Sequence, residues 1–171
     1  RTVEGMAADG TPFRGVLYAG LMIGPHGFNV LEYNVRFGDP ECQPLMLMLK
    51  SDLAVLLRQA ASGELPSGPL SWHSGAALCV ALVAGGYPGP YEKGKRIEGL
   101  DALTESDALR VFHAGTKTLP SGEIVTNGGR VLGVTARGDD VSEAAKLAYD
   151  AAAKISWNGM RMRRDIGHRA L

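Results

Sequence analysis

The sequence predicts an α+β fold, in which antiparallel strands and helices occupy separate stretches of the chain. Three observations support this prediction. Apolar, β-prone runs at 15–23 and 28–35 flank a turn that contains Gly and Pro, which indicates a hairpin. Leucines recur with helical spacing at 52–62, after the hairpin. Short strand-like runs then precede one Ala-rich helix, which we expect to end near residue 155.

The composition allows a buried core and excludes several kinds of partner. The chain has 171 residues, of which 45% are hydrophobic, and its 18 Lys and Arg balance 18 Asp and Glu. A net charge of zero gives no broad basic surface for nucleic acid or an anionic membrane. No apolar run approaches the roughly 20 residues of a membrane helix. We therefore expect a cytoplasmic protein, with Cys42 and Cys79 as reduced thiols.

Turn-forming and capping residues predict where the elements and domains end. Ser51 is expected to cap the helix at 52–62, and Gly63 to end it. The Pro- and Gly-rich stretch that follows is typical of a domain boundary. The predicted parts are a first domain portion at 1–65, a linker at 66–75 and a C-terminal domain at 76–171.

The C-terminal part is expected to be a small antiparallel sheet with one main helix. A strand is predicted at 76–84 and another at 109–114. Asn127-Gly128, a strong signal for a tight turn, predicts a hairpin between the runs that flank it. Asp140 and Glu143 have the spacing of a capping box at the start of the helix.

The main candidate for chemistry is the return strand of the first hairpin. Side chains alternate along a strand, so Val30, Glu32 and Asn34 are expected on one face, with Arg36 following on the same side. A carboxylate and an amide supply the oxygen ligands that Mg²⁺ prefers, and Mg²⁺ commonly shares its ligands with nucleotide phosphates. The spacing alone is equally compatible with a solvated strand face, because Glu-x-Asn is common in strands.

Several longer motifs decide between these readings. The strand and the loop after it, LEYNVRFGDPE at 31–41, resemble the metal-binding strand of the phosphoribosylamine–glycine ligases, a branch of the ATP-grasp superfamily. The resemblance covers essentially the whole chain, in order. The other motifs that carry it are TVEGMAADGTPFRGVLYAGLM, GGYPGPYEKG, VFHAGT, TNGGRVLGVTA and RRDIGHRAL.

The resemblance implies a fold and a reaction. The fold would be the C-terminal part of an ATP-grasp domain, followed by the small sheet domain. In the family reaction, ATP phosphorylates glycine and the amine of 5-phosphoribosylamine attacks the glycyl phosphate, which gives glycinamide ribonucleotide, ADP and phosphate. Phosphoryl transfer of this kind depends on positioning and charge neutralisation.

The resemblance also implies roles for individual residues. Glu32 and Asn34 would bind the Mg²⁺ or Mn²⁺ that bridges the ATP phosphates. Arg36 would stabilise the transferring phosphoryl group or the carboxylate, since its planar fork matches either group. One departure is that the preceding stretch, 16–20, carries no acid. The family's metal would then have few protein ligands, and we expect weak metal binding without nucleotide.

Three further residues are candidates for binding substrate. Asp39 and Glu41 would orient Arg36 or bind the amino group of glycine, or else they are loop residues that cap the next helix. Arg130, beside the Asn-Gly turn, would approach the substrate from the C-terminal domain, or the turn is only a hairpin turn. His113 and His168 are expected to be structural.

The family's enzymes also need an N-terminal domain and a lid over ATP. This sequence begins after both, so we expect a fragment that has no ligase activity alone. The alternative is a non-catalytic module for assembly or nucleotide binding derived from the same fold. A biotin-dependent carboxylase component is disfavoured, because the GDPE and DIGHRAL segments match the glycine-ligase branch.

Overall fold

The computed structural model describes residues 1–64 and 68–170. The described chain divides into two compact units, the first made of Arg1–Asp39 and Leu49–Trp72 and the second of Pro40–Met48 and His73–Leu171. Residues 66 and 67 of the predicted linker lie outside the described residues. Among the described residues, no helix is both long and apolar enough to span a membrane.

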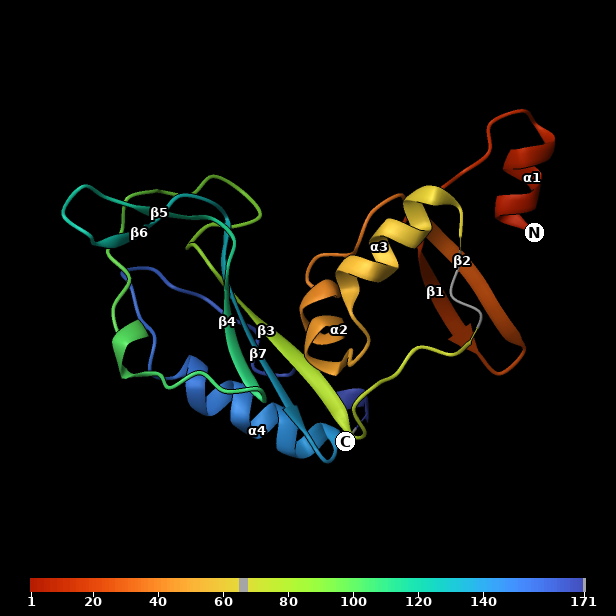
Figure 1. The fold of residues 1–171 in the computed structure, drawn as a ribbon. Helices are drawn as coiled ribbons and strands as arrows, with labels where there is room; N and C mark the ends of the chain where they lie inside the picture. The colour runs from red at the N-terminus through yellow and green to blue at the C-terminus, as the bar shows by residue number, and fades with distance from the viewer. Residues whose placement is uncertain (65–67, 171) are drawn as a thin grey trace. The chain divides into compact units, whose positions relative to one another are not determined.

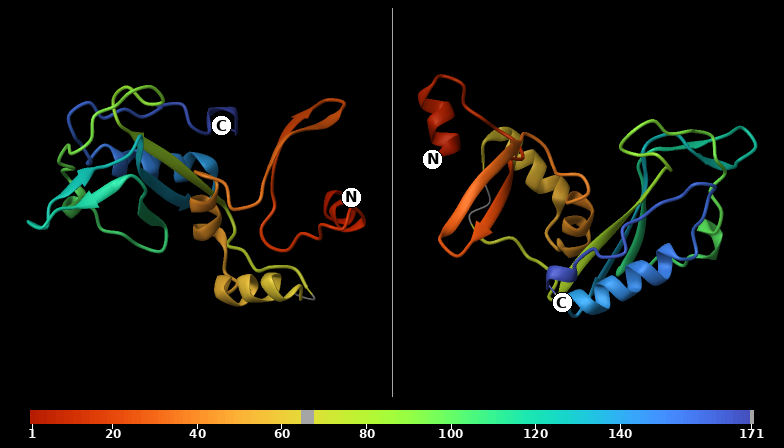
Figure 2. Two further views of the ribbon diagram at one scale, coloured as in Figure 1. Left: turned by 90° about the horizontal axis from the view of Figure 1, so that it is seen from above. Right: turned by 180° about the vertical axis from the view of Figure 1, so that it is seen from behind.

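The first unit contains the predicted hairpin and two helices. Helix α1 (Thr2–Ala8) precedes strands β1 (Tyr18–Gly24) and β2 (Gly27–Asn34), and α3 (Leu53–Ser62) follows them. The strands pair antiparallel around a short turn, which confirms the hairpin, and both views of Figure 2 show them as one two-stranded ribbon. Most side chains of this ribbon are exposed.

A change of register interrupts the hairpin and alters which side chains share a face. Gly20 lies opposite Glu32, whereas Leu21, the next residue of β1, lies opposite Val30. Cross-strand partners point to the same face, and a bulge of this kind breaks the alternation. The expectation that Val30 shares a face with Glu32 is therefore wrong, whereas Glu32 and Asn34 lie on the same side of the irregularity.

The ends of α3 follow local side-chain chemistry. The Asp52 carboxylate accepts hydrogen bonds from the N–H groups of Ala54 and Val55, at 2.9 and 3.2 Å, so Asp52 and not Ser51 is the N-cap. The Ser51 hydroxyl instead accepts from the Ser71 N–H at 2.8 Å. Gly63 ends the helix in the left-handed conformation (φ 78°), as predicted.

The second unit is built on a three-stranded antiparallel sheet. Its strand order is β3–β7–β4, with β3 at Ala76–Val83, β7 at Arg130–Gly138 and β4 at Leu109–His113. Figure 1 shows α4 (Val141–Ala152) running along one face of this sheet. The core lies between them, and α2 (Cys42–Met48) also contacts β3 and β7.

The core combines aliphatic side chains of the sheet with small side chains of α4. Leu82 and Val134 are fully buried and pack with the alanines of α4. Small side chains on the helix allow it to approach the sheet closely, so the larger aliphatic groups of the strands fill the space. Trp157, after α4, belongs to the same cluster and is 7% exposed.

The predicted hairpin at the Asn-Gly turn is wrong. Strand β6 (Ile124–Thr126) pairs with β5 (Thr116–Thr118), while β7, which follows the turn, belongs to the larger sheet. The backbone around the turn approaches other segments closely, since a Cβ at Gly128 would lie 2.8 Å from the Gly115 Cα. Tertiary pairing thus overrides the local turn signal. Two short 3₁₀ helices, η1 (Leu100–Ala102) and η2 (His168–Ala170), complete the unit.

The start of α4 provides a testable contribution to stability. The Asp140 carboxylate accepts from the Glu143 N–H at 2.8 Å, as the capping pattern predicts. Glu143 reaches back to the Asp139 N–H at 2.6 Å, one residue beyond the usual partner. Replacing Asp140 by Ala leaves orphan N–H groups, and we expect the unit to lose about 1 kcal/mol of stability.

Urea denaturation followed by the fluorescence of the buried Trp157 measures this loss. Ser142→Ala is the matched control, because Ser142 is an exposed polar residue in the same helical turn that makes no capping bond among the described residues. Equal unfolding midpoints for the Asp140 and Ser142 variants would contradict the capping role.

Candidate functional site

Two of the predicted site residues lie in contact on β2. The Asn34 Nδ2 donates a hydrogen bond to the Glu32 Oε1 at 3.1 Å. Glu32 is exposed and Asn34 is half-buried, so neither side chain is enclosed in a core. The acid and the amide therefore point to the same side of an accessible strand.

A glycine on the neighbouring strand gives Glu32 its space. Gly20 is the cross-strand partner of Glu32, and a Cβ at Gly20 would lie 3.2 Å from the Glu32 Cγ. Tyr18 is the partner of Asn34. The pair thus has a small residue beside the carboxylate and an aromatic residue beside the amide. Gly20 was not a candidate from sequence, because only the register of the hairpin reveals its position.

The two side chains fit part of a divalent-cation site. Cis ligands of an octahedral Mg²⁺, each about 2.1 Å from the ion, lie about 3 Å apart. The 3.1 Å separation of the Glu32 Oε1 and the Asn34 amide is close to that spacing. Rotation of the amide by half a turn would replace its N–H by its oxygen, and nothing in the described packing encloses it. Among the described residues, no group of three or more His, Cys, Asp or Glu could hold a metal.

The remaining predicted site residues are divided between the units. Arg36 follows the end of β2 in a bend, so strand alternation does not fix its direction. It is exposed, and its Nη1 donates to the Phe37 carbonyl at 2.9 Å. Asp39, also exposed, ends the first segment of unit 1. Glu41 and Arg130 belong to the second unit, with Glu41 just before α2 and Arg130 at the start of β7.

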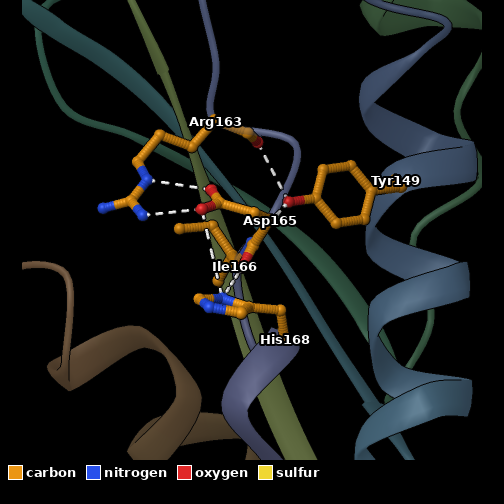
Figure 3. Close-up of polar contacts among 5 residues, drawn as sticks. All are labelled: Tyr149, Arg163, Asp165, Ile166 and His168. Atoms are coloured by element: carbon orange, nitrogen blue, oxygen red, sulfur yellow. Dashed lines mark hydrogen bonds and ion pairs between the residues drawn. The ribbon is translucent and has the colours of Figure 1, made fainter. Parts of the chain in front are cut away.

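A polar cluster near the C-terminus contains Arg163, Asp165 and His168. The Asp165 carboxylate accepts from the Arg163 Nε at 3.0 Å and from its Nη2 at 2.9 Å, the paired geometry that Figure 3 shows. Hydrogen bonding to Arg163 is the main cause that lowers the pKa of Asp165, and the same contact raises the pKa of Arg163. The His168 Nδ1 lies 2.7 Å from the Asp165 carbonyl.

Tyr149 of α4 binds residues 163–166 to the helix through two hydrogen bonds. Its hydroxyl donates to the Arg163 carbonyl at 2.9 Å and accepts from the Ile166 N–H at 3.1 Å. In Figure 3 the ring of Tyr149 extends from the helix toward the 163–166 chain. The orientation of Arg163 is therefore fixed by both its backbone and its side chain.

Comparisons with known proteins first define the class. The chain has the fold of part of an ATP-grasp enzyme. Its structure overlays on the biotin carboxylase domain of 2-oxoglutarate carboxylase from Hydrogenobacter thermophilus with a TM-score of 0.63 over 91% of this chain, at only 16% identity. It covers 34% of that domain's chain.

Two models of protein families match the chain, and both describe domains of the same family. Residues 1–42 match the family "Phosphoribosylglycinamide synthetase, ATP-grasp (A) domain". Residues 77–169, more than half of the chain, match "Phosphoribosylglycinamide synthetase, C domain". The chain belongs to the phosphoribosylglycinamide synthetase family, which confirms the resemblance of its motifs.

Individual relatives agree with this assignment. The chain is 54% identical over 171 residues to the phosphoribosylamine–glycine ligase of Caulobacter vibrioides and 52% over 172 residues to that of Synechocystis, in each case over 99% of this chain. The structure of the Thermotoga maritima enzyme matches with a TM-score of 0.79 and 36% identity over 95% of this chain. The chain spans 39–41% of the length of these relatives.

Proposed function

We propose that this chain supplies metal ligands and the C domain to an enzyme that joins glycine to 5-phosphoribosylamine with the use of ATP. The products would be glycinamide ribonucleotide, ADP and phosphate. The family membership and the names of the relatives support the reaction. The observation that carries the chain's own part in it is the contact between Glu32 and Asn34 on an exposed strand.

Each predicted residue has a distinct role in this proposal. Glu32 and Asn34 hold a divalent cation, which when bound neutralises charge on the ATP phosphates. Arg36 offers five N–H donors to the transferring phosphoryl group or the glycine carboxylate. Asp39 and Glu41 bind the ammonium group of glycine or orient Arg36, and Arg130 contacts substrate from the C domain.

The donor set favours Mg²⁺ or Mn²⁺ and weak binding in the absence of nucleotide. Carboxylate and amide oxygens are hard ligands, which suit both ions. Two protein ligands leave most of an octahedral shell to water and phosphate oxygens. The cation therefore binds mainly together with ATP.

A chimeric enzyme tests the proposed function directly. The present sequence replaces the matching segment of the Vibrio cholerae ligase. The two sequences are 53% identical over 171 residues, and this chain covers 39% of the length of that ligase. We expect the chimera to release ADP only when glycine and 5-phosphoribosylamine are both present, and to form glycinamide ribonucleotide. The 171-residue chain alone is expected to show no such activity, because it spans only 39–41% of its relatives.

The unaltered Vibrio cholerae enzyme is the control for substrate quality and for the assay. A chimera that folds cooperatively yet releases no glycine-dependent ADP would contradict the proposal. That result would favour the alternative of a non-catalytic assembly or nucleotide-binding module.

A further inference from the structure

Gly20 lies directly across the hairpin from Glu32, at a place where the backbone does not call for a glycine. Its φ is not among the positive values that other glycines of this chain adopt. In the interior of a strand, glycine loses more conformational entropy on folding than alanine does and offers no side chain to pack. The property that sets this position apart is therefore the side chain opposite it.

The space above Gly20 is limited by the side chain of Glu32 and not by its backbone. A Cβ on Gly20 would lie 3.2 Å from the Glu32 Cγ, 3.6 Å from its carbonyl oxygen and 3.8 Å from its backbone nitrogen. Carbon atoms prefer a separation of about 3.5–4.0 Å, so the first contact is too short and the other two are ordinary. A larger residue at position 20 would thus displace the Glu32 side chain and leave the paired strands in place.

Displacement of this side chain reaches the contact between Glu32 and Asn34. The Glu32 Oε1 lies beyond Cγ along the side chain, and it accepts from the Asn34 Nδ2 at 3.1 Å. A change of the χ1 rotamer would carry the carboxylate far from the amide, because staggered rotamers differ by about 120°. Asn34 would not follow, since its own cross-strand partner is Tyr18. The separation of the two groups therefore depends on the missing side chain at position 20.

The irregularity of the hairpin begins at the same place. The register changes between Gly20 and Leu21, so Gly20 is the last residue of β1 that is in register with Glu32 and Asn34. Irregularities of this kind redirect side chains and are over-represented next to active sites. The direction of the Glu32 side chain is thus set at the end of the regular pairing.

We propose that Gly20 is a positioning residue, which keeps the Glu32 carboxylate turned toward Asn34. The consequence for a cation that the two groups share rests on the proposed function, whereas the direction of the side chain depends only on the hairpin. A larger residue at position 20 separates the two groups beyond the roughly 3 Å that adjacent ligands of Mg²⁺ span. Metal affinity then falls although neither ligand has been replaced.

Gly20→Ala tests this role in the ¹⁵N-labelled 171-residue chain. The NMR signals of the Asn34 side-chain amide report its hydrogen bond to Glu32, and bound Mn²⁺ broadens the same signals. Without metal, Gly20→Ala should move these signals toward their positions in Glu32→Ala, where the bond is absent. The Mn²⁺ concentration that halves their intensity should rise about tenfold, as the loss of a group that orients a metal ligand commonly causes.

Strand stability separates positioning from a merely structural role. Ala is more favourable than Gly in a strand, and Val more favourable still, so the hairpin should be at least as stable in Gly20→Ala and Gly20→Val. Hydrogen exchange of the β1 and β2 amides measures this stability. The larger side chain of Gly20→Val should nevertheless weaken Mn²⁺ binding more than Gly20→Ala does. Loss of protection in β1 and β2 that matches the loss of Mn²⁺ affinity would contradict positioning.

Gly24→Ala is the matched control. Gly24 is on the same strand and also lacks a positive φ, but no atom beyond its chain neighbours lies within 4 Å of the place that its Cβ would take. Its replacement should leave the Asn34 signals in place and change the Mn²⁺ dependence by no more than about twofold. Equal effects of the Gly20 and Gly24 variants, or Asn34 signals that Gly20→Ala leaves unchanged, would overturn the inference.

The two readouts distinguish this inference from the proposed function. The hydrogen bond of Asn34 is measured without metal and without turnover. If it depends on Gly20 while Mn²⁺ broadens no Asn34 signal, the positioning of Glu32 is upheld and its role as a metal ligand is refuted. An inactive chimera, combined with Mn²⁺ binding that depends on Gly20, would contradict only the ligation reaction.

Discussion

Replacement of Glu32 by Gln is expected to lower kcat/KM of the chimeric ligase about 100-fold, as the loss of charge stabilisation in a transition state commonly does. The amide keeps the size and the hydrogen-bonding capacity of the side chain but removes its negative charge. Glu32 supplies the one carboxylate of the Glu32–Asn34 pair, so the variant leaves that pair without a negative charge. Part of the lost rate should return at high Mg²⁺ or Mn²⁺ concentration, because the weakened site can still be filled by mass action.

Glu4→Gln is the matched control for this prediction. Glu4 belongs to the same unit but lies in α1, where it is exposed. Its replacement should leave both the rate and its dependence on metal concentration unchanged. Wild-type activity of the Glu32 variant at limiting Mg²⁺ would refute the role of Glu32 as a metal ligand.

The alternation rule predicts correctly that Glu32 and Asn34 share a face of β2, but it is wrong for Val30. Glu32 and Asn34 are two residues apart on an uninterrupted stretch of β2, so their side chains point to the same face. Val30 lies beyond a change of register, and nothing in its neighbouring residue types announces that irregularity. The position of Gly20 opposite Glu32 likewise depends on the register. Sequence periodicity is thus reliable over a few residues and fails across a bulge.

Long-range pairing limited the prediction of the C-terminal unit. The strands at 76–83 and 109–113 and the helix at 141–152 were expected close to their observed bounds, because each carries its own apolar pattern. The Asn-Gly turn predicts a hairpin, yet the two strands that flank it pair with different strands. The choice of partner depends on surfaces that are distant in sequence, which a local turn signal does not contain.

A cavity in the second unit that Arg130, Arg161 and Arg163 line shows the same limit. Arg130 and Arg161 are 31 positions apart, and Tyr87 is more than 40 positions before Arg130. Nothing in the local sequence around Arg161 points to Val83 as its neighbour. Only the pairing of Arg161 with Val83 brings it to the end of β3 and beside the cavity. A cavity assembled from separate strands and loops therefore requires the fold before it can be recognised.

The largest effect on stability is expected from Leu82→Ala. Leu82 is fully buried at 0% exposure in β3, within the cluster that joins the sheet to α4. Truncation removes buried methyl groups and leaves a cavity between elements that cannot fully collapse, so the second unit should lose about 3 kcal/mol. Urea denaturation followed by Trp157 fluorescence measures the change. Since α4 covers this cluster, its amides should also lose protection from hydrogen exchange.

Leu147→Ala provides the comparison for that experiment. Leu147 is on the same α4 helix but is 36% exposed, so its truncation removes less buried surface and should destabilise the unit by less than about 1.5 kcal/mol. Both variants carry the same substitution, Leu to Ala. The difference between their losses of stability therefore reports the effect of burial alone. If both variants unfold at the same urea concentration, burial of Leu82 between β3 and α4 is not a main source of the stability of the second unit.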